Sequence, residues 1–66
     1  MVAQRGNSKP EAKILVVDDE PTIRELLSAS LRFAGFDVAT AQDGAEAIRV
    51  ERDFQADLVV LDIMLP

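Results

Sequence analysis

Three aspartates stand where two apolar runs of the sequence end. Asp18 and Asp19 follow the run 13–17, and Asp62 follows the run 58–61. Carboxylates that are brought together repel one another, so such a cluster must either retain a proton or recruit a hard cation. Mg²⁺ binds a few carboxylate oxygens and leaves its other positions to water and phosphate, which favours the cation.

A metal ion at these residues would let one carboxylate act as a nucleophile. Once the charge is offset, a carboxylate oxygen can attack a phosphoryl group in line and form an aspartyl phosphate. We predict Asp62 as this nucleophile, Asp19 as a direct metal ligand and Asp18 as a residue that acts on the metal through water. The backbone carbonyl of Met64 would supply a further oxygen as the chain turns after Asp62.

The same acidic residues also have a structural interpretation. Asp18 and Asp19 precede Pro21, where carboxylates cap a helix and complement its dipole. Glu20 and Arg24 have the i, i+4 spacing of a solvated surface pair. A chemical role is favoured because nothing structural requires three like charges to converge on one place.

Convergence requires the two apolar runs to be neighbouring strands. Both runs lack alternation, which is typical of buried strands, whereas the more polar segment 37–41 suits an edge strand. A helix is expected from Pro21 to a stop at Gly35, where Phe36 would pack back on the last turn. Its apolar stripe comprises Ile23, Leu26, Leu27, Leu31 and Ala34. Asp43 and Glu46 have capping-box spacing and open a second helix that runs to about Arg52.

The resulting order is strand, helix, strand, helix, strand, which predicts an α/β fold with a parallel sheet. Right-handed crossovers leave two arrangements, with the third strand beside the second or beside the first. The order 2-1-3 is favoured because it places the most apolar strand in the centre. This doubly wound, flavodoxin-like order puts the carboxyl ends of the first and third strands at a topological switch point, where such sheets bind ligands.

Composition excludes several classes of function. The 66 residues can form one small core, and a net charge of −5 disfavours direct binding of DNA, RNA or anionic lipid. The sequence has no cysteine and no histidine, so disulfides, thiolate nucleophiles and Cys/His zinc sites are excluded. The longest apolar run has four residues, too few for a membrane span, and no secretory signal is apparent, so we expect a cytoplasmic protein. Residues 1–12 are polar and aperiodic and are expected to form a flexible tail.

Four landmarks together resemble the N-terminal half of a two-component response-regulator receiver domain. They are ILVVDDEP at 14–21, the Gly35-Phe36 helix stop, DGAEA at 43–47 and LVVLDIMLP at 58–66. The resemblance covers residues 13–66 without a gap. It implies phosphotransfer from a sensor histidine kinase to Asp62, with Mg²⁺ held by Asp18, Asp19, Asp62 and the Met64 carbonyl. The matched segments are most similar to regulators that carry a winged-helix DNA-binding output domain, so DNA would be contacted only through that domain.

The chain departs from the family pattern after the third strand. A receiver continues through further helices and strands that carry a Ser/Thr switch residue and a Lys that pairs with the phosphoryl group, and it commonly offers a dimerising surface. We therefore expect residues 13–66 to be a receiver truncated after the third strand, with an open apolar edge and a marginal fold. Mg²⁺ binding should persist without these parts, and switching should not.

Two other functions use the same scaffold. An interaction module, or a non-switching fragment, would never take phosphate, although the three retained aspartates argue against it. A Mg²⁺-dependent phosphohydrolase would be a true enzyme, but sequences that resemble such enzymes have an Asp-x-Asp pattern at the end of the first strand. The sequence Asp18-Asp19-Glu20 lacks that spacing. We therefore predict a phosphoacceptor that is not an enzyme in its own right.

Overall fold

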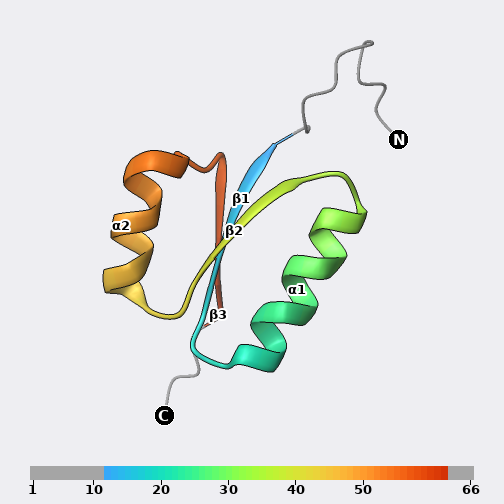
Figure 1. Ribbon diagram of the computed structural model, residues 1–66, viewed down its shortest axis with the longest axis horizontal. Coiled ribbons are helices and arrows are strands. Elements are labelled where there is room, and N and C mark those ends of the chain that lie inside the picture. The colour runs from blue at the N-terminus through green and yellow to red at the C-terminus, as the bar shows by residue number, and fades with distance from the viewer. Residues whose placement is uncertain (1–11, 63–66) are drawn as a thin grey trace.

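The computed structural model describes residues 12–62, the last of them through its backbone only. The elements follow in the order β1 (Lys13–Asp18), α1 (Pro21–Phe33), β2 (Asp37–Ala41), α2 (Gly44–Phe54) and β3 (Leu58–Asp62). The three strands form a parallel sheet in the order β2-β1-β3, and the two helices flank it on opposite sides (Figure 1). The predicted α/β, flavodoxin-like order 2-1-3 is confirmed.

The central strand β1 supplies the core of the molecule. Leu15 and Val16 are 1% and 0% exposed, and because side chains alternate along a strand they face opposite sides of the sheet. The cluster on the α1 side contains Ile14, Val16, Val38, Leu27, Leu31, Phe36 and Val60. The cluster on the α2 side contains Leu15, Val17, Ala41, Ala39, Ala47, Val50, Phe54 and Ala56. The sheet is therefore covered on both faces at β1.

Helix α1 begins and ends at capped positions. Its N-cap is Glu20, whose Oε2 accepts a hydrogen bond from the backbone N–H of Thr22 at 3.2 Å. At the other end Gly35 adopts a φ of 105°, and the N–H of Phe36 donates to the carbonyl of Leu31 at 3.1 Å. This is the bond pattern of a Schellman stop, as predicted.

The predicted apolar stripe of α1 is only partly buried. Leu27 and Leu31 pack on the core, but Leu26 is 61% exposed and Ile23 is 39% exposed. Ala34 is also exposed and lies just beyond the helix. Part of the stripe stays exposed because α1 contacts β1 and β2, whereas its flank meets no other element of residues 12–62.

Helix α2 starts at the predicted Asp43 cap, but the Glu46 side chain accepts from the residue before the cap and not from Asp43 as in a capping box. Asp43 Oδ1 accepts from the N–H of Glu46 at 2.8 Å, and Glu46 Oε1 accepts from the N–H of Gln42 at 2.7 Å. The helix continues to Phe54, slightly beyond the predicted end, and closes at Gln55, whose φ is 54°. These caps fix where the chain turns back toward β3.

Strand β3 is an edge strand within residues 12–62. Leu58, Val59 and Leu61 are 56%, 44% and 60% exposed, because β3 pairs on one side with β1 and no described segment pairs with its other side. Strand β2 forms the opposite edge, as predicted. Neither helix within this part of the chain is long and apolar enough to cross a membrane.

Candidate phosphoacceptor site

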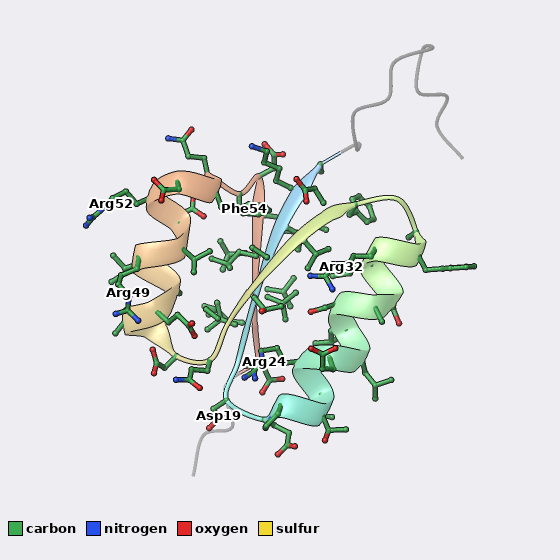
Figure 2. All side chains as sticks on the ribbon, in the orientation of Figure 1. Asp19, Arg24, Arg32, Arg49, Arg52 and Phe54 are labelled. Atoms are coloured by element: carbon green, nitrogen blue, oxygen red, sulfur yellow. The ribbon has the colours of Figure 1, made fainter. Side chains whose placement is uncertain are left out.

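Two aspartates occupy matching positions at the carboxyl edge of the sheet. Asp18 and Asp62 are register partners at the last position of the parallel pair β1 and β3. Neighbouring strands lie about 4.8 Å apart, so the two backbones are adjacent there. Asp19 follows Asp18 directly and is exposed at the same end of the sheet (Figure 2). The sheet order thus brings together backbone positions that are far apart in the sequence.

The side chain of Asp18 is buried and only partly hydrogen-bonded. It is 4% exposed, and its Oδ1 accepts from the N–H of Glu20 at 2.9 Å. Its Oδ2 is buried and has no hydrogen-bond partner among the described residues. An unpartnered buried oxygen of this kind costs free energy unless another group supplies positive charge or a proton. The donor set therefore fits a hard cation such as Mg²⁺, which prefers carboxylate oxygens.

Of the remaining predicted ligands, the structure describes only Asp19 in full. Asp19 is exposed to solvent, which suits either direct or water-mediated metal binding. The side chain of Asp62 and the carbonyl of Met64 lie outside what the structure describes. Among the described side chains, no group of three His, Cys, Asp or Glu residues comes together as a metal site. The described part of the site thus consists of two carboxylates and the backbone position of Asp62.

Arg24 contacts the loop between β1 and α1 directly. We call this segment, residues 18–20, the acidic loop. Its Nη1 donates to the backbone carbonyl of Asp18 at 2.8 Å, and the half-buried side chain reaches from α1 toward the end of β1 (Figure 2). The sequence interpretation paired Arg24 with Glu20 at the surface; instead Glu20 caps α1 while Arg24 holds the loop. The spacing of charges along a helix did not reveal this contact, because it depends on how β1 turns into α1.

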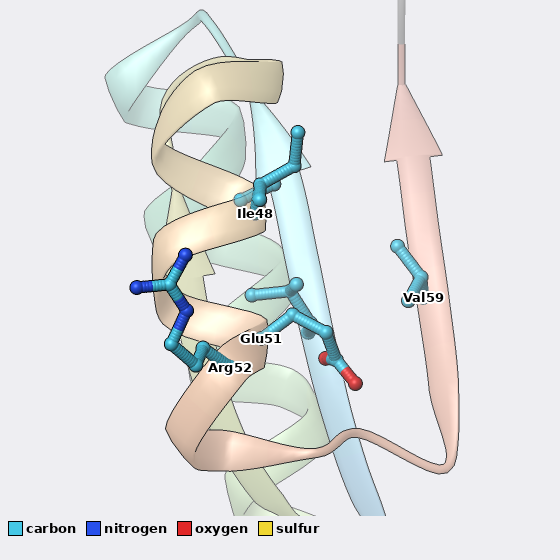
Figure 3. A pocket seen from close by; sticks show the side chains of 6 residues that line it. Ile48, Glu51, Arg52 and Val59 are labelled. Carbon is cyan, nitrogen blue, oxygen red and sulfur yellow. The ribbon is translucent and has the colours of Figure 1, made fainter.

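A separate apolar groove lies between α2 and β3. It encloses about 430 Å³ and is lined by Leu15, Ala47, Ile48, Glu51, Arg52 and Val59 (Figure 3). The one carboxylate in this lining, Glu51, uses both oxygens to accept from the N–H of Ala56 at 3.0 Å. The groove lining therefore has no free carboxylate.

Doubly wound parallel sheets bind their ligands at the topological switch point, beyond the carboxyl ends of the strands. In this chain two aspartates on neighbouring strands lie at that point. The chain belongs to the family described as the response regulator receiver domain, which matches residues 14–66. This confirms the family that the four sequence landmarks indicated.

Several curated relatives are similar to the chain. It is 54% identical over 54 residues to the alkaline phosphatase synthesis transcriptional regulatory protein PhoP of Bacillus subtilis. The aligned residues cover 82% of the chain and 22% of PhoP. It is 50% identical over 54 residues to the DNA-binding response regulator MtrA of Mycolicibacterium smegmatis, covering 82% of the chain and 24% of MtrA. It is 46% identical over 63 residues to a Mycobacterium tuberculosis protein named Probable transcriptional regulatory protein TcrX, covering 96% of the chain and 26% of TcrX. The chain thus spans about a quarter of the length of these relatives.

Proposed function

We propose that this chain is the phosphoacceptor part of a response regulator and that Asp62 accepts a phosphoryl group from a sensor histidine kinase. One observation carries the proposal. Asp62 is the register partner of Asp18, and Asp18 holds a buried carboxylate oxygen without a hydrogen-bond partner. This arrangement suits a site that is completed by Mg²⁺ and phosphate rather than by the protein alone.

Each acidic residue has a distinct task in this proposal. Bound Mg²⁺ would offset the negative charge of the carboxylates and of the incoming phosphoryl group. Asp18 and Asp19 hold the ion from the end of β1, with Asp18 oriented by the Glu20 N–H, and the Met64 carbonyl adds an oxygen. A carboxylate oxygen of Asp62 forms the new P–O bond while the P–N bond to the kinase histidine breaks. The leaving imidazole keeps the electron pair of that bond and takes up a proton from water.

The role of the longer protein follows from its relatives. PhoP is named a transcriptional regulatory protein and MtrA a DNA-binding response regulator. We propose that phosphorylation of this chain controls a DNA-binding output domain in a cytoplasmic regulator, which dimerises as a full-length protein. In this proposal residues 13–66 form the N-terminal half of the receiver. The tail predicted at residues 1–12 lies, except for its last residue, outside the part of the chain that the structure describes. The chain serves as a signalling domain, and its only chemistry is its own phosphorylation.

Exposure of the 66-residue chain to acetyl phosphate tests the proposal. With Mg²⁺ present, intact-mass spectrometry is expected to show the gain of one phosphoryl group. The Asp62→Asn variant should gain none, because an amide cannot form the aspartyl phosphate. The matched control is Asp53→Asn, which removes an exposed carboxylate from α2 and should label like the natural chain. A natural chain that gains nothing, or an Asp62→Asn variant that gains as much as the control, would refute the proposal.

A further inference from the structure

Arg24 donates a side-chain hydrogen bond to the backbone of the acidic loop. The residue lies in the first turns of α1, where its own N–H donates to the carbonyl of Glu20 at 2.9 Å. Its side chain runs back along the chain, and Nη1 donates to the carbonyl of Asp18 at 2.8 Å. Hydrogen bonds from a guanidinium are among the stronger ones in proteins, because the donor carries charge.

The acceptor of this bond is the oxygen of the peptide unit that joins Asp18 to Asp19. The orientation of this peptide unit determines the direction in which each of the two carboxylates leaves the backbone. A second bond, from the Glu20 N–H to Asp18 Oδ1 at 2.9 Å, fixes the side chain of Asp18 on the same loop. Together the two bonds hold the loop so that Asp18 Oδ2 remains the free, buried oxygen.

Arg24 is itself held firmly by α1. The hydroxyl of Ser28 donates to the carbonyl of Arg24 at 2.7 Å, and Ser28 is 0% exposed. Leu27 and Leu31 on the same helix pack on the core. The guanidinium therefore reaches the loop from an element whose position is fixed by burial, and the stem of Arg24 can transmit that position to the loop.

We propose that Arg24 is a positioning residue for the metal and phosphoryl site: it orients the Asp18–Asp19 peptide so that both carboxylates face a single cation. This inference rests on the proposed function. A group that orients metal ligands without touching the metal typically changes metal affinity by 10-fold to 100-fold when it is removed.

The positive charge of Arg24 weakens Mg²⁺ binding, whereas its hydrogen bond to the loop strengthens it. The direction in which Mg²⁺ affinity changes when Arg24 is replaced therefore tests the proposal. A guanidinium near the site repels a divalent cation, so loss of the charge alone would tighten Mg²⁺ binding. Loss of the positioning bond would weaken Mg²⁺ binding, because the two carboxylates would no longer be held in one arrangement. The variant Arg24→Met removes both the charge and the bond at similar side-chain length.

The experiment uses the 66-residue chain and follows backbone amides by NMR. Mg²⁺ affinity is read from the Asp19 amide during a titration, and loop order is read from hydrogen exchange of the Glu20 amide without metal. Arg24→Met is expected to weaken Mg²⁺ affinity by about tenfold and to speed exchange at Glu20. Arg24→Lys keeps the charge but has one donor nitrogen in place of the planar guanidinium, so it should restore part of the affinity.

Arg32→Met is the matched control. Arg32 lies on the same helix and also donates to a backbone carbonyl, from Nη2 to Val38 at 3.1 Å, but this carbonyl belongs to β2. Its loss should change stability in the same way as the loss of Arg24 and leave Mg²⁺ affinity and Glu20 exchange unaltered. A merely structural role of Arg24 would give the same result for both variants.

Three outcomes would overturn the inference in distinguishable ways. Unchanged or tighter Mg²⁺ binding in Arg24→Met, beside a normal response in the natural chain, overturns the role of Arg24 alone. An absent response in the natural chain overturns the proposed function and the role of Arg24 with it. If Arg24→Met does not fold, Arg24→Lys decides: an affinity below that of the natural chain supports the positioning role, and an equal affinity overturns it.

Discussion

Replacement of Asp18 by asparagine should raise the stability of the metal-free chain and abolish its response to Mg²⁺. The amide keeps the shape of the side chain and can still accept from the Glu20 N–H, as Oδ1 does at 2.9 Å. It removes the charge of a carboxylate that is 4% exposed and whose Oδ2 has no partner. An uncompensated buried acceptor costs about 1–3 kcal/mol, but the new NH₂ group also lacks an acceptor. We therefore expect a net gain of about 1 kcal/mol in the free energy of unfolding.

Mg²⁺ should act in the opposite direction on the natural chain. A ligand that binds only the folded state at about ten times its Kd stabilises that state by about 1.4 kcal/mol. The Asp18→Asn variant should gain close to nothing, because it lacks one of the carboxylates proposed to bind the ion. The stability difference between the two proteins should therefore close or reverse when Mg²⁺ is added.

Urea unfolding followed by far-ultraviolet circular dichroism measures both effects. The sequence contains no Trp and no Tyr, so intrinsic fluorescence offers little signal, whereas α1 and α2 give a helical one. Asp53→Asn, in the exposed part of α2, is the control and should respond to Mg²⁺ like the natural chain. The reasoning is refuted if Asp18→Asn lowers stability without metal and gains as much from Mg²⁺ as the natural chain does.

Substitutions at four further positions test how the fold is held. Asp43→Ala removes the bond that Asp43 accepts from the Glu46 N–H at 2.8 Å and should cost about 1 kcal/mol, measured by urea unfolding, with Ser restoring most of the loss. Gly35→Ala places a side chain at a φ of 105°, where an added Cβ meets nothing within 4 Å, so the expected cost of about 1–2 kcal/mol is strain alone and should appear as a lower urea midpoint. Leu15→Ala should cost about 2–5 kcal/mol and unfold a chain this small, whereas Leu58→Ala, at a side chain that is 56% exposed, should leave the circular dichroism spectrum close to that of the natural chain. Equal losses at the two leucines would contradict the assignment of β1 as the central strand.

Much of this fold could be predicted because its signals are local. The apolar runs 13–17 and 58–61 mark two strands, and the more polar 37–41 marks an edge. Gly35 and Asp43 specify where one helix ends and the next begins, through a left-handed backbone and a cap. The order β2-β1-β3 follows from placing the most apolar strand in the centre.

Which apolar side chains of α1 are buried could not be predicted in the same way. Helical periodicity groups Leu26 with Leu27, yet Leu27 packs on the core and Leu26 is 61% exposed. The periodicity of α1 identifies an apolar arc, but only contact with β1 and β2 determines which part of that arc is covered. Which residues of an amphipathic helix are core is thus a property of the sheet beneath it.

In the candidate site, too, some features could be predicted from the sequence and others could not. The positions of Asp18 and Asp62 at one edge follow from strand order, and register pairs them as neighbours. Arg24 was missed because its partner is a backbone carbonyl, which leaves no trace in a pattern of side-chain charges. The unpartnered Oδ2 of Asp18 likewise depends on how the loop after β1 turns. Hydrogen bonds to the backbone of a loop are where sequence patterns are least informative.

The central claim is that Asp62 carries the phosphoryl group, and locating the label tests it most directly. The chain is treated with acetyl phosphate and Mg²⁺, then with borohydride, which reduces an aspartyl phosphate to a homoserine, and its peptides are sequenced by mass spectrometry. We expect homoserine in place of Asp62 and unmodified Asp18 and Asp19. Homoserine at Asp18 or Asp19 with Asp62 intact, or no homoserine in a chain that responds to Mg²⁺, would contradict the account.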